Sequence, residues 1–134
     1  MEYLIGVLLA LSVACLAVLA GLDRDRAFYP TVMCVIASYY VLFAVMGASR
    51  STLLVEIAVA MAFLSLAIVG FKKSLWLVAA TIVGHGVFDS VHHLFIQNGG
   101  LPRWWPGFCF AFDVVFGGAL AVQLMRHRPA SLSR

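Results

Sequence analysis

Five apolar runs, each close to the length of a membrane-spanning helix, account for most of this chain. A helix needs about 20 mostly apolar residues to cross the hydrocarbon core of a bilayer. The runs cover residues 3–22, 28–48, 53–71, 75–97 and 107–124. Because 63% of the residues are hydrophobic and 11% are charged, a soluble domain of this size could not bury its apolar surface. The sequence predicts one all-α integral membrane domain over residues 1–134, a compact bundle of five transmembrane helices.

Short polar segments separate the runs. Glu2 precedes the first run and no Lys or Arg does, which favours a retained span over a cleaved signal peptide. Residues 49–52 contain helix-capping serines and a threonine, and Lys72 with Lys73 closes the third run. The stretch Asn98-Gly-Gly-Leu-Pro ends the fourth run, because these residues break helices.

The loop charges predict an orientation. Arg50 and Arg103 lie on one side of the predicted bundle, and the other seven basic residues lie on the opposite side: Arg24, Arg26, Lys72, Lys73, Arg126, Arg128 and Arg134. Because Lys and Arg favour the cytoplasmic side, we expect the N-terminus outside and a polar tail, residues 125–134, in the cytoplasm. We expect a bacterial inner membrane. Nine scattered Lys and Arg residues form no nucleic-acid surface.

Four ionisable residues mark one face of the fourth run: His85, Asp89, His92 and His93. At about 100° per residue they fall within an arc of roughly 100°. Ionisable side chains inside a membrane are costly and typically mark a functional site. Gly84 and Gly86 flank His85 and leave room for close helix packing or for a bound group.

Other runs supply polar residues at matching depths. At about 1.5 Å per residue, Asp89 and Asp113 both lie about 12 Å below the outer face. Glu56 lies about 7 Å below it, level with His92 and His93. Tyr39 and Tyr40 lie at about 13 Å but point about 100° apart, so at most one of them faces the site. The shared depths indicate one polar site in the outer half of the membrane.

Imidazole and carboxylate groups that converge from neighbouring helices are typical of metal sites in helix bundles. The predicted ligands are His85, Asp89, His92, His93, Asp113 and Glu56. Such nitrogen and oxygen ligands suit a divalent Zn, Fe or Mn ion. His85 and His92 lie about 10 Å apart along the helix axis, so either one metal uses a subset or two metals share Asp89. All intramembrane histidines lie on one run, which argues against a bis-histidine haem within one protomer.

Two resemblances concern the chemistry of this region. Residues 85–93 read HGVFD followed by SVHH, which resembles the histidine boxes of membrane-bound desaturases and hydroxylases, with Asp89 in place of a histidine. The placement of His and Asp on neighbouring helices near one membrane face resembles the zinc-dependent hydrolases of the alkaline ceramidase type. Both resemblances cover the fourth and fifth runs and imply metal-dependent chemistry on a lipid.

The leading hypothesis is a small membrane metalloenzyme, a hydrolase or an iron oxygenase, that acts on a lipid-like or other hydrophobic substrate. In a hydrolase Asp89 or Asp113 would be the catalytic general base, whereas an oxygenase would need iron and an external electron donor. A proton or metal-ion transport bundle that uses the same residues is the first alternative. A non-catalytic subunit of a larger membrane complex is the second. Five helices shield a buried site from lipid only with a thin wall. We therefore expect a homo-oligomer or a partner protein.

Overall fold

The computed structural model shows an all-helical protein and describes residues 1–126. Within that range, five helices are long and apolar enough to cross a membrane. The elements are α1 (Glu2–Ala20), the 3-10 helix η1 (Leu22–Arg24), α2 (Phe28–Gly47), α3 (Arg50–Lys73), α4 (Leu75–Phe95) and α5 (Trp105–Arg126). The prediction of an all-α fold with five membrane-spanning candidates is confirmed, and these helices indicate an integral membrane protein in contact with the lipid bilayer. Most of the predicted cytoplasmic tail, from His127 onward, lies outside the described residues.

Serines and a glycine set several helix ends. Ser49 accepts a hydrogen bond from the Thr52 N–H at the start of α3 (3.1 Å), and Ser74 accepts one from the Trp76 N–H at the start of α4 (3.2 Å). The free N–H groups of a first turn need such partners, because apolar surroundings offer none. Gly21 ends α1 with a φ of 73°, in the left-handed region that glycine adopts without a steric penalty.

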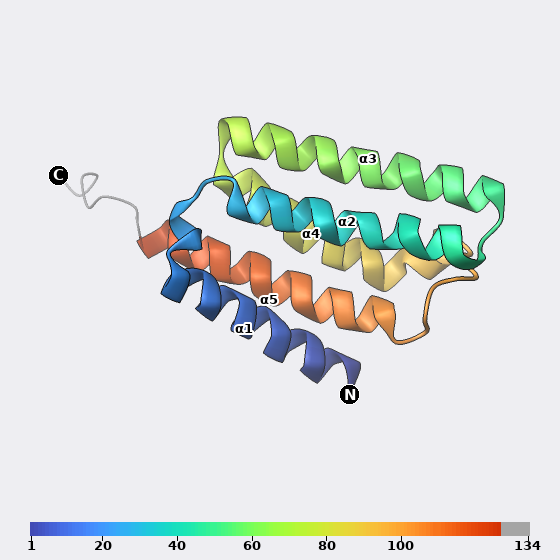
Figure 1. Ribbon diagram of the computed structural model, residues 1–134, viewed down its shortest axis with the longest axis horizontal. Coiled ribbons are helices and arrows are strands. Elements are labelled where there is room, and N and C mark those ends of the chain that lie inside the picture. The colour runs from blue at the N-terminus through green and yellow to red at the C-terminus, as the bar shows by residue number, and fades with distance from the viewer. Residues whose placement is uncertain (127–134) are drawn as a thin grey trace.

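Successive helices run in opposite directions and form an up-and-down bundle (Figure 1). Within it α4 is central: it packs most extensively against α5 and also contacts α3 and α2. Its partner α5 separates it from α1, which packs mainly on α5. This central position carries the ionisable residues of α4 into the interior.

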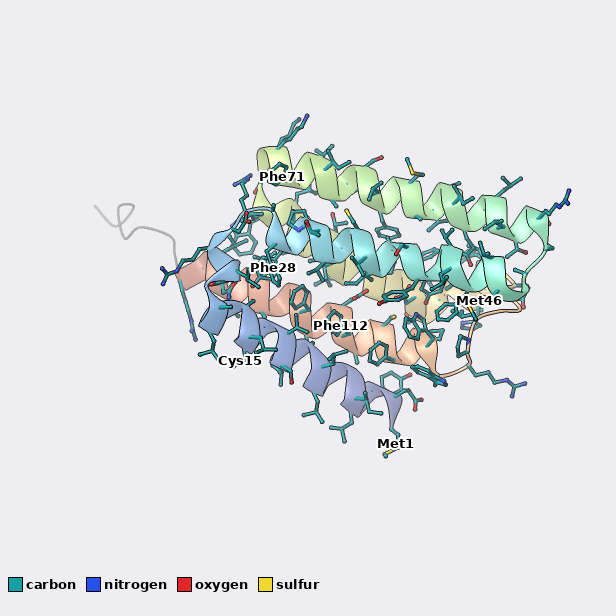
Figure 2. All side chains as sticks on the ribbon, in the orientation of Figure 1. Met1, Cys15, Phe28, Met46, Phe71 and Phe112 are labelled. Atoms are coloured by element: carbon teal, nitrogen blue, oxygen red, sulfur yellow. The ribbon has the colours of Figure 1, made fainter. Side chains whose placement is uncertain are left out.

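The outward faces of the helices are apolar. Leu4, Leu8 and Leu11 on α1 and Leu54 and Met61 on α3 are all more than half exposed. Figure 2 shows carbon side chains along the flank of α1, while nitrogen-bearing side chains gather at the two ends of the bundle. This distribution suits helices that face lipid along their length and water at their ends.

The described basic residues divide between the two ends of the bundle as the sequence predicts. Arg50 and Arg103 lie at the end that also holds the N-terminus. The opposite end holds Arg24, Arg26, Lys72, Lys73 and Arg126. Which end faces the cytoplasm stays a prediction from the positive-inside rule.

Reporter fusions test that orientation. We expect a reporter fused after Lys73 or after Leu124 to be active in the cytoplasm, and one fused after Arg50 to be active outside. The reason is the concentration of Lys and Arg at the end that contains Lys73. An external signal from either of the first two fusions would contradict the orientation and move the polar site to the cytoplasmic half.

Candidate metal centre

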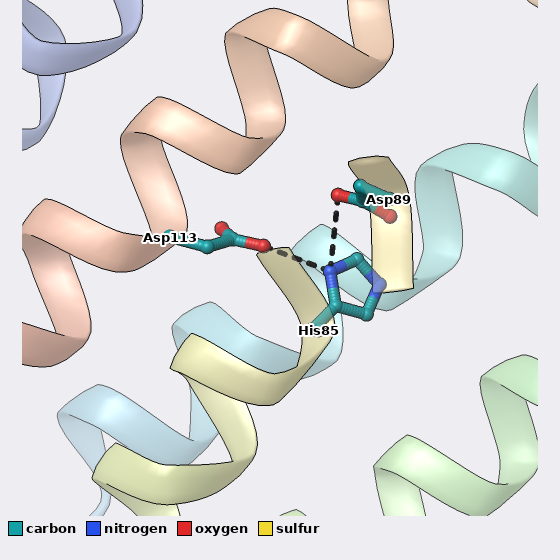
Figure 3. A group of neighbouring side chains, drawn as sticks. All are labelled: His85, Asp89 and Asp113. Atoms are coloured by element: carbon teal, nitrogen blue, oxygen red, sulfur yellow. Dashed lines mark hydrogen bonds and ion pairs between the residues drawn. The ribbon is translucent and has the colours of Figure 1, made fainter. Parts of the chain in front are cut away.

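Three buried ionisable side chains meet at the centre of the bundle: His85 and Asp89 from α4, and Asp113 from α5 (Figure 3). The Nδ1 atom of His85 lies 2.8 Å from Asp113 Oδ2 and 3.4 Å from Asp89 Oδ2. His85 is 3% exposed, and both aspartates are 0% exposed. One ligand atom from each residue lies within 4.8 Å of the other two. The spacing of four residues places His85 and Asp89 one above the other on the same face of α4.

Close packing of α4 on α5 lets Asp113 reach His85. A Cβ atom on Gly86 would lie 2.8 Å from Asp113 Cβ and 3.2 Å from the carbonyl oxygen of Phe110. A Cβ atom on Gly84 would meet nothing within 4 Å. Small residues are common where membrane helices approach closely. Of the two glycines that flank His85, Gly86 therefore permits the close approach, and Gly84 faces open space.

The three-residue group holds more hydrogen-bond acceptors than donors. No described residue makes a well-formed hydrogen bond with Asp89 Oδ1, Asp89 Oδ2 or Asp113 Oδ1, although His85 Nδ1 lies 3.4 Å from Asp89 Oδ2 and the Tyr40 hydroxyl interacts with Asp89. His85 contributes one ring N–H when it is neutral and two when it is protonated. Buried carboxylates that lack donors or cations are costly, and lipid surroundings increase that cost. The group therefore needs a cation or additional protons.

A divalent metal ion would meet this need. One imidazole nitrogen and two carboxylates form a nitrogen and oxygen ligand set, which suits Zn, Fe or Mn. Three protein ligands with one open position are the usual pattern of a catalytic zinc site. The structure thus contains a buried His85–Asp89–Asp113 group that could hold a metal ion. Two protons, one on His85 and one on an aspartate, would balance the charge instead.

A second buried cluster contains His92 and Glu56. His92 Nε2 donates a hydrogen bond to Glu56 Oε1 of α3 (2.9 Å). Asn98, in the loop after α4, donates to the same oxygen (2.8 Å) and to the backbone oxygen of Tyr40 on α2 (3.1 Å). Its Oδ1 accepts a hydrogen bond from the Gly100 N–H (3.2 Å). These contacts tie the loop between α4 and α5 to the opposite side of the bundle.

The two clusters take their partner carboxylates from different neighbours of α4: His85 contacts Asp113 of α5, and His92 contacts Glu56 of α3. Tyr40 packs against a histidine of each cluster: its ring centroid lies 4.5 Å from that of His92 and 6.2 Å from that of His85. The Tyr40 hydroxyl makes no well-formed hydrogen bond in the described range, but it interacts with Asp89. Of the two adjacent tyrosines, Tyr40 is the one that faces the site, while the Tyr39 ring packs against Trp105.

The structure does not bring Glu56, His92 or His93 to the three-residue group. His93 is exposed, and it lines a groove of about 770 Å³ at the end of the bundle that holds the N-terminus. His92, Asn98 and Arg103 line the same groove. The four ionisable residues of α4 were predicted to share one polar face. Their arc of roughly 100° is wide enough to face two neighbouring helices, α3 and α5, and also the exposed groove.

Sequence reasoning missed the role of Asn98, which it treated only as part of a helix-breaking segment. Its amide is nevertheless a structural link between three helices. Composition offers no signal for this link, because Asn before Gly-Gly is typical of any turn.

We compared the chain with known protein families, with curated proteins and with solved structures, and none of them matches it.

Proposed function

We propose that this protein is a metal-dependent membrane enzyme that acts on a lipid-like, hydrophobic substrate. His85, Asp89 and Asp113 would hold one divalent ion, Zn, Fe or Mn. The observation that carries the proposal is the excess of buried acceptors: three carboxylate oxygens of this group make no well-formed hydrogen bond within residues 1–126. A purely structural polar cluster normally satisfies its buried acceptors, so the excess favours a bound cation.

Hydrolysis is the reaction that this residue set supports with the fewest additional components. A metal ion there would polarise the bond under attack and activate a water molecule. The water oxygen would bond to the electrophilic carbon or phosphorus atom of the substrate. The carboxylate oxygen of Asp89 or Asp113 that does not hold the ion would accept the proton that the water loses and return it to the leaving group as its bond breaks. An iron oxygenase would need dioxygen and an external electron donor as well.

The surroundings of the group favour a hydrophobic substrate. The Phe63 ring lies edge-on to the His85 ring, with centroids 4.7 Å apart. The three candidate ligands lie within helices that have the length and composition of membrane spans. By the predicted orientation the group lies in the outer half of the bilayer, where a lipid-like molecule reaches it without crossing the membrane.

A transport function has less support, because few polar groups line the interior on the far side of His85, and the Tyr29 hydroxyl there is paired with Gln123. Tyr29, Met33, Ile82 and Phe116 fill that end of the bundle, and each is at most 1% exposed. The Thr81 hydroxyl donates to a backbone oxygen of its own helix. A proton or ion relay needs polar groups along its whole length, so this packing favours a pocket over a pore.

Metal analysis is the first experiment. We expect protein purified without chelator to carry about one Zn, Fe or Mn ion per chain, since three ligands with an open position define a single site. Inductively coupled plasma mass spectrometry measures both content and identity. Zn or Mn would support hydrolysis, and Fe would support the oxidative form. Background metal content, both as purified and after incubation with each of the three ions, would contradict the metalloenzyme proposal.

A further inference from the structure

An apolar groove of about 320 Å³ lies between α1 and α2, alongside α5. Leu9 and Val13 line it from α1, and Ile36 lines it from α2. Phe108 and Phe112 line it from α5. The groove is distinct from the polar groove at the end of the bundle, because its walls are the sides of membrane-spanning helices.

The wall of the groove borders the candidate metal centre. Asp113 is among its lining residues, although this side chain is 0% exposed to water. One carboxylate oxygen of Asp113 contacts His85, and the other, Oδ1, has no hydrogen-bond partner in the described part of the chain. An ionisable group beside lipid-facing space is costly and typically functional. Asp113 therefore lies between the apolar groove and the polar three-residue group, behind the surface of the groove wall.

The groove is also open to the hydrocarbon layer. Leu9 and Val35, which both line it, are 44% and 50% exposed on the sides of their helices. Trp105 lines the groove near the start of α5, and its indole Nε1 has no hydrogen-bond partner among the described residues. At about 1.5 Å per residue, Trp105 and Asp113 are about 12 Å apart along α5. The groove thus runs along the length of α5, with Trp105 at one end and the Asp113 carboxylate near the other.

We propose that this groove binds the hydrocarbon chain of a single-chain lipid, with the polar group of that lipid next to Asp113. This inference rests on the proposed function and names its substrate class. Ligand pockets commonly measure about 300–1,000 Å³, so a groove of about 320 Å³ accommodates part of one hydrocarbon chain and not two chains side by side. Its open side lets the rest of the chain extend into the bilayer.

Photolabelling of the full-length protein in phosphatidylcholine vesicles tests the proposal. The probe is a monoacylglycerol with a diazirine in its acyl chain, and the comparison probe is a phosphatidylcholine with the same diazirine. We expect the monoacyl probe to label peptides that contain Leu9, Ile36 or Phe112, and excess unlabelled monoacylglycerol to suppress this labelling. The diacyl probe should label exposed residues such as Leu54 as well, without competition.

Two neighbouring leucines provide a matched pair of variants. Leu9→Trp places a large ring in the groove, whereas Leu8, which is 55% exposed, does not line it. We expect Leu9→Trp to lower competable labelling about tenfold or more, the lower range of what steric filling of an apolar pocket costs. Leu8→Trp should label like the wild type, and both variants should keep their metal. Leu9→Phe replaces Leu9→Trp if the larger ring prevents folding.

The outcomes separate this inference from the proposed function. Labelling that is spread evenly over the exposed faces, or that unlabelled monoacylglycerol does not suppress, overturns the groove as a substrate site even in a metal-loaded protein. Equal labelling of Leu9→Trp and Leu8→Trp overturns it too. Competable labelling of the groove in a protein that binds no metal supports the binding site and contradicts the metalloenzyme.

Discussion

Asp113→Ala is expected to remove the metal ion and the activity together. Asp113 is the group member from α5, and its Oδ2 lies 2.8 Å from His85 Nδ1. Its loss leaves His85 and Asp89, two ligands on a single helix. Since outer-shell partners alone are worth about 10–100-fold in metal affinity, we expect a loss above that range. Elemental analysis and metal titration of the purified variant measure it, and Asp89→Ala should behave alike.

Glu56→Gln is the matched control for these two variants. Glu56 is also a buried acid, but it contacts His92 and Asn98 rather than the three-residue group. We expect this variant to keep its metal ion. If Asp89→Ala and Asp113→Ala fold and keep the wild-type metal content, the group holds no metal. In that case Asp89→Asn should cost at most about 1–2 kcal/mol of stability, as a membrane hydrogen bond does.

The fold could be predicted from the sequence because few backbone structures are stable within the hydrocarbon core of a bilayer. A backbone in hydrocarbon must satisfy its own hydrogen bonds, so apolar runs of this length become helices. The least accurate boundary is the start of α3, predicted at Leu53 and observed at Arg50. Polar residues at the ends of spans cause such errors. The apolar run of the sequence ends at the edge of the hydrocarbon core, whereas the helix continues into the membrane interface.

The sequence predicts how deep each candidate site residue lies in the membrane. It does not predict which neighbouring helix each of these residues faces. Depth follows from counting residues along a helix, and it correctly placed Glu56 at the level of His92, which it contacts. Which neighbour each side of α4 meets depends on packing against other helices, and one sequence does not contain that information. The predicted six-residue set therefore divides in the structure: Asp113 contacts His85 from α5, and Glu56 contacts His92 from α3.

The smallest substitution in this region is expected to have one of the largest effects. In Gly86→Ala the new Cβ would lie 2.8 Å from Asp113 Cβ and 3.2 Å from the backbone oxygen of Phe110. Neither atom is the far end of a flexible side chain, so α5 has to move away from α4. That movement lengthens the contact between His85 and Asp113. A displacement of about 1 Å can cost about 100-fold in activity, and we expect metal affinity to fall with it.

Gly84→Ala is the control, because the same methyl group two residues earlier meets nothing within 4 Å. There the exchange of Gly for Ala should stabilise α4 by up to about 1 kcal/mol through helix propensity. Metal content, activity and thermal unfolding of the two variants, measured side by side, test the prediction. If Gly86→Ala keeps wild-type metal affinity and activity, as Gly84→Ala should, then close packing at Gly86 does not position Asp113. Loss of both properties in Gly86→Ala alone would tie the candidate site to the α4–α5 interface.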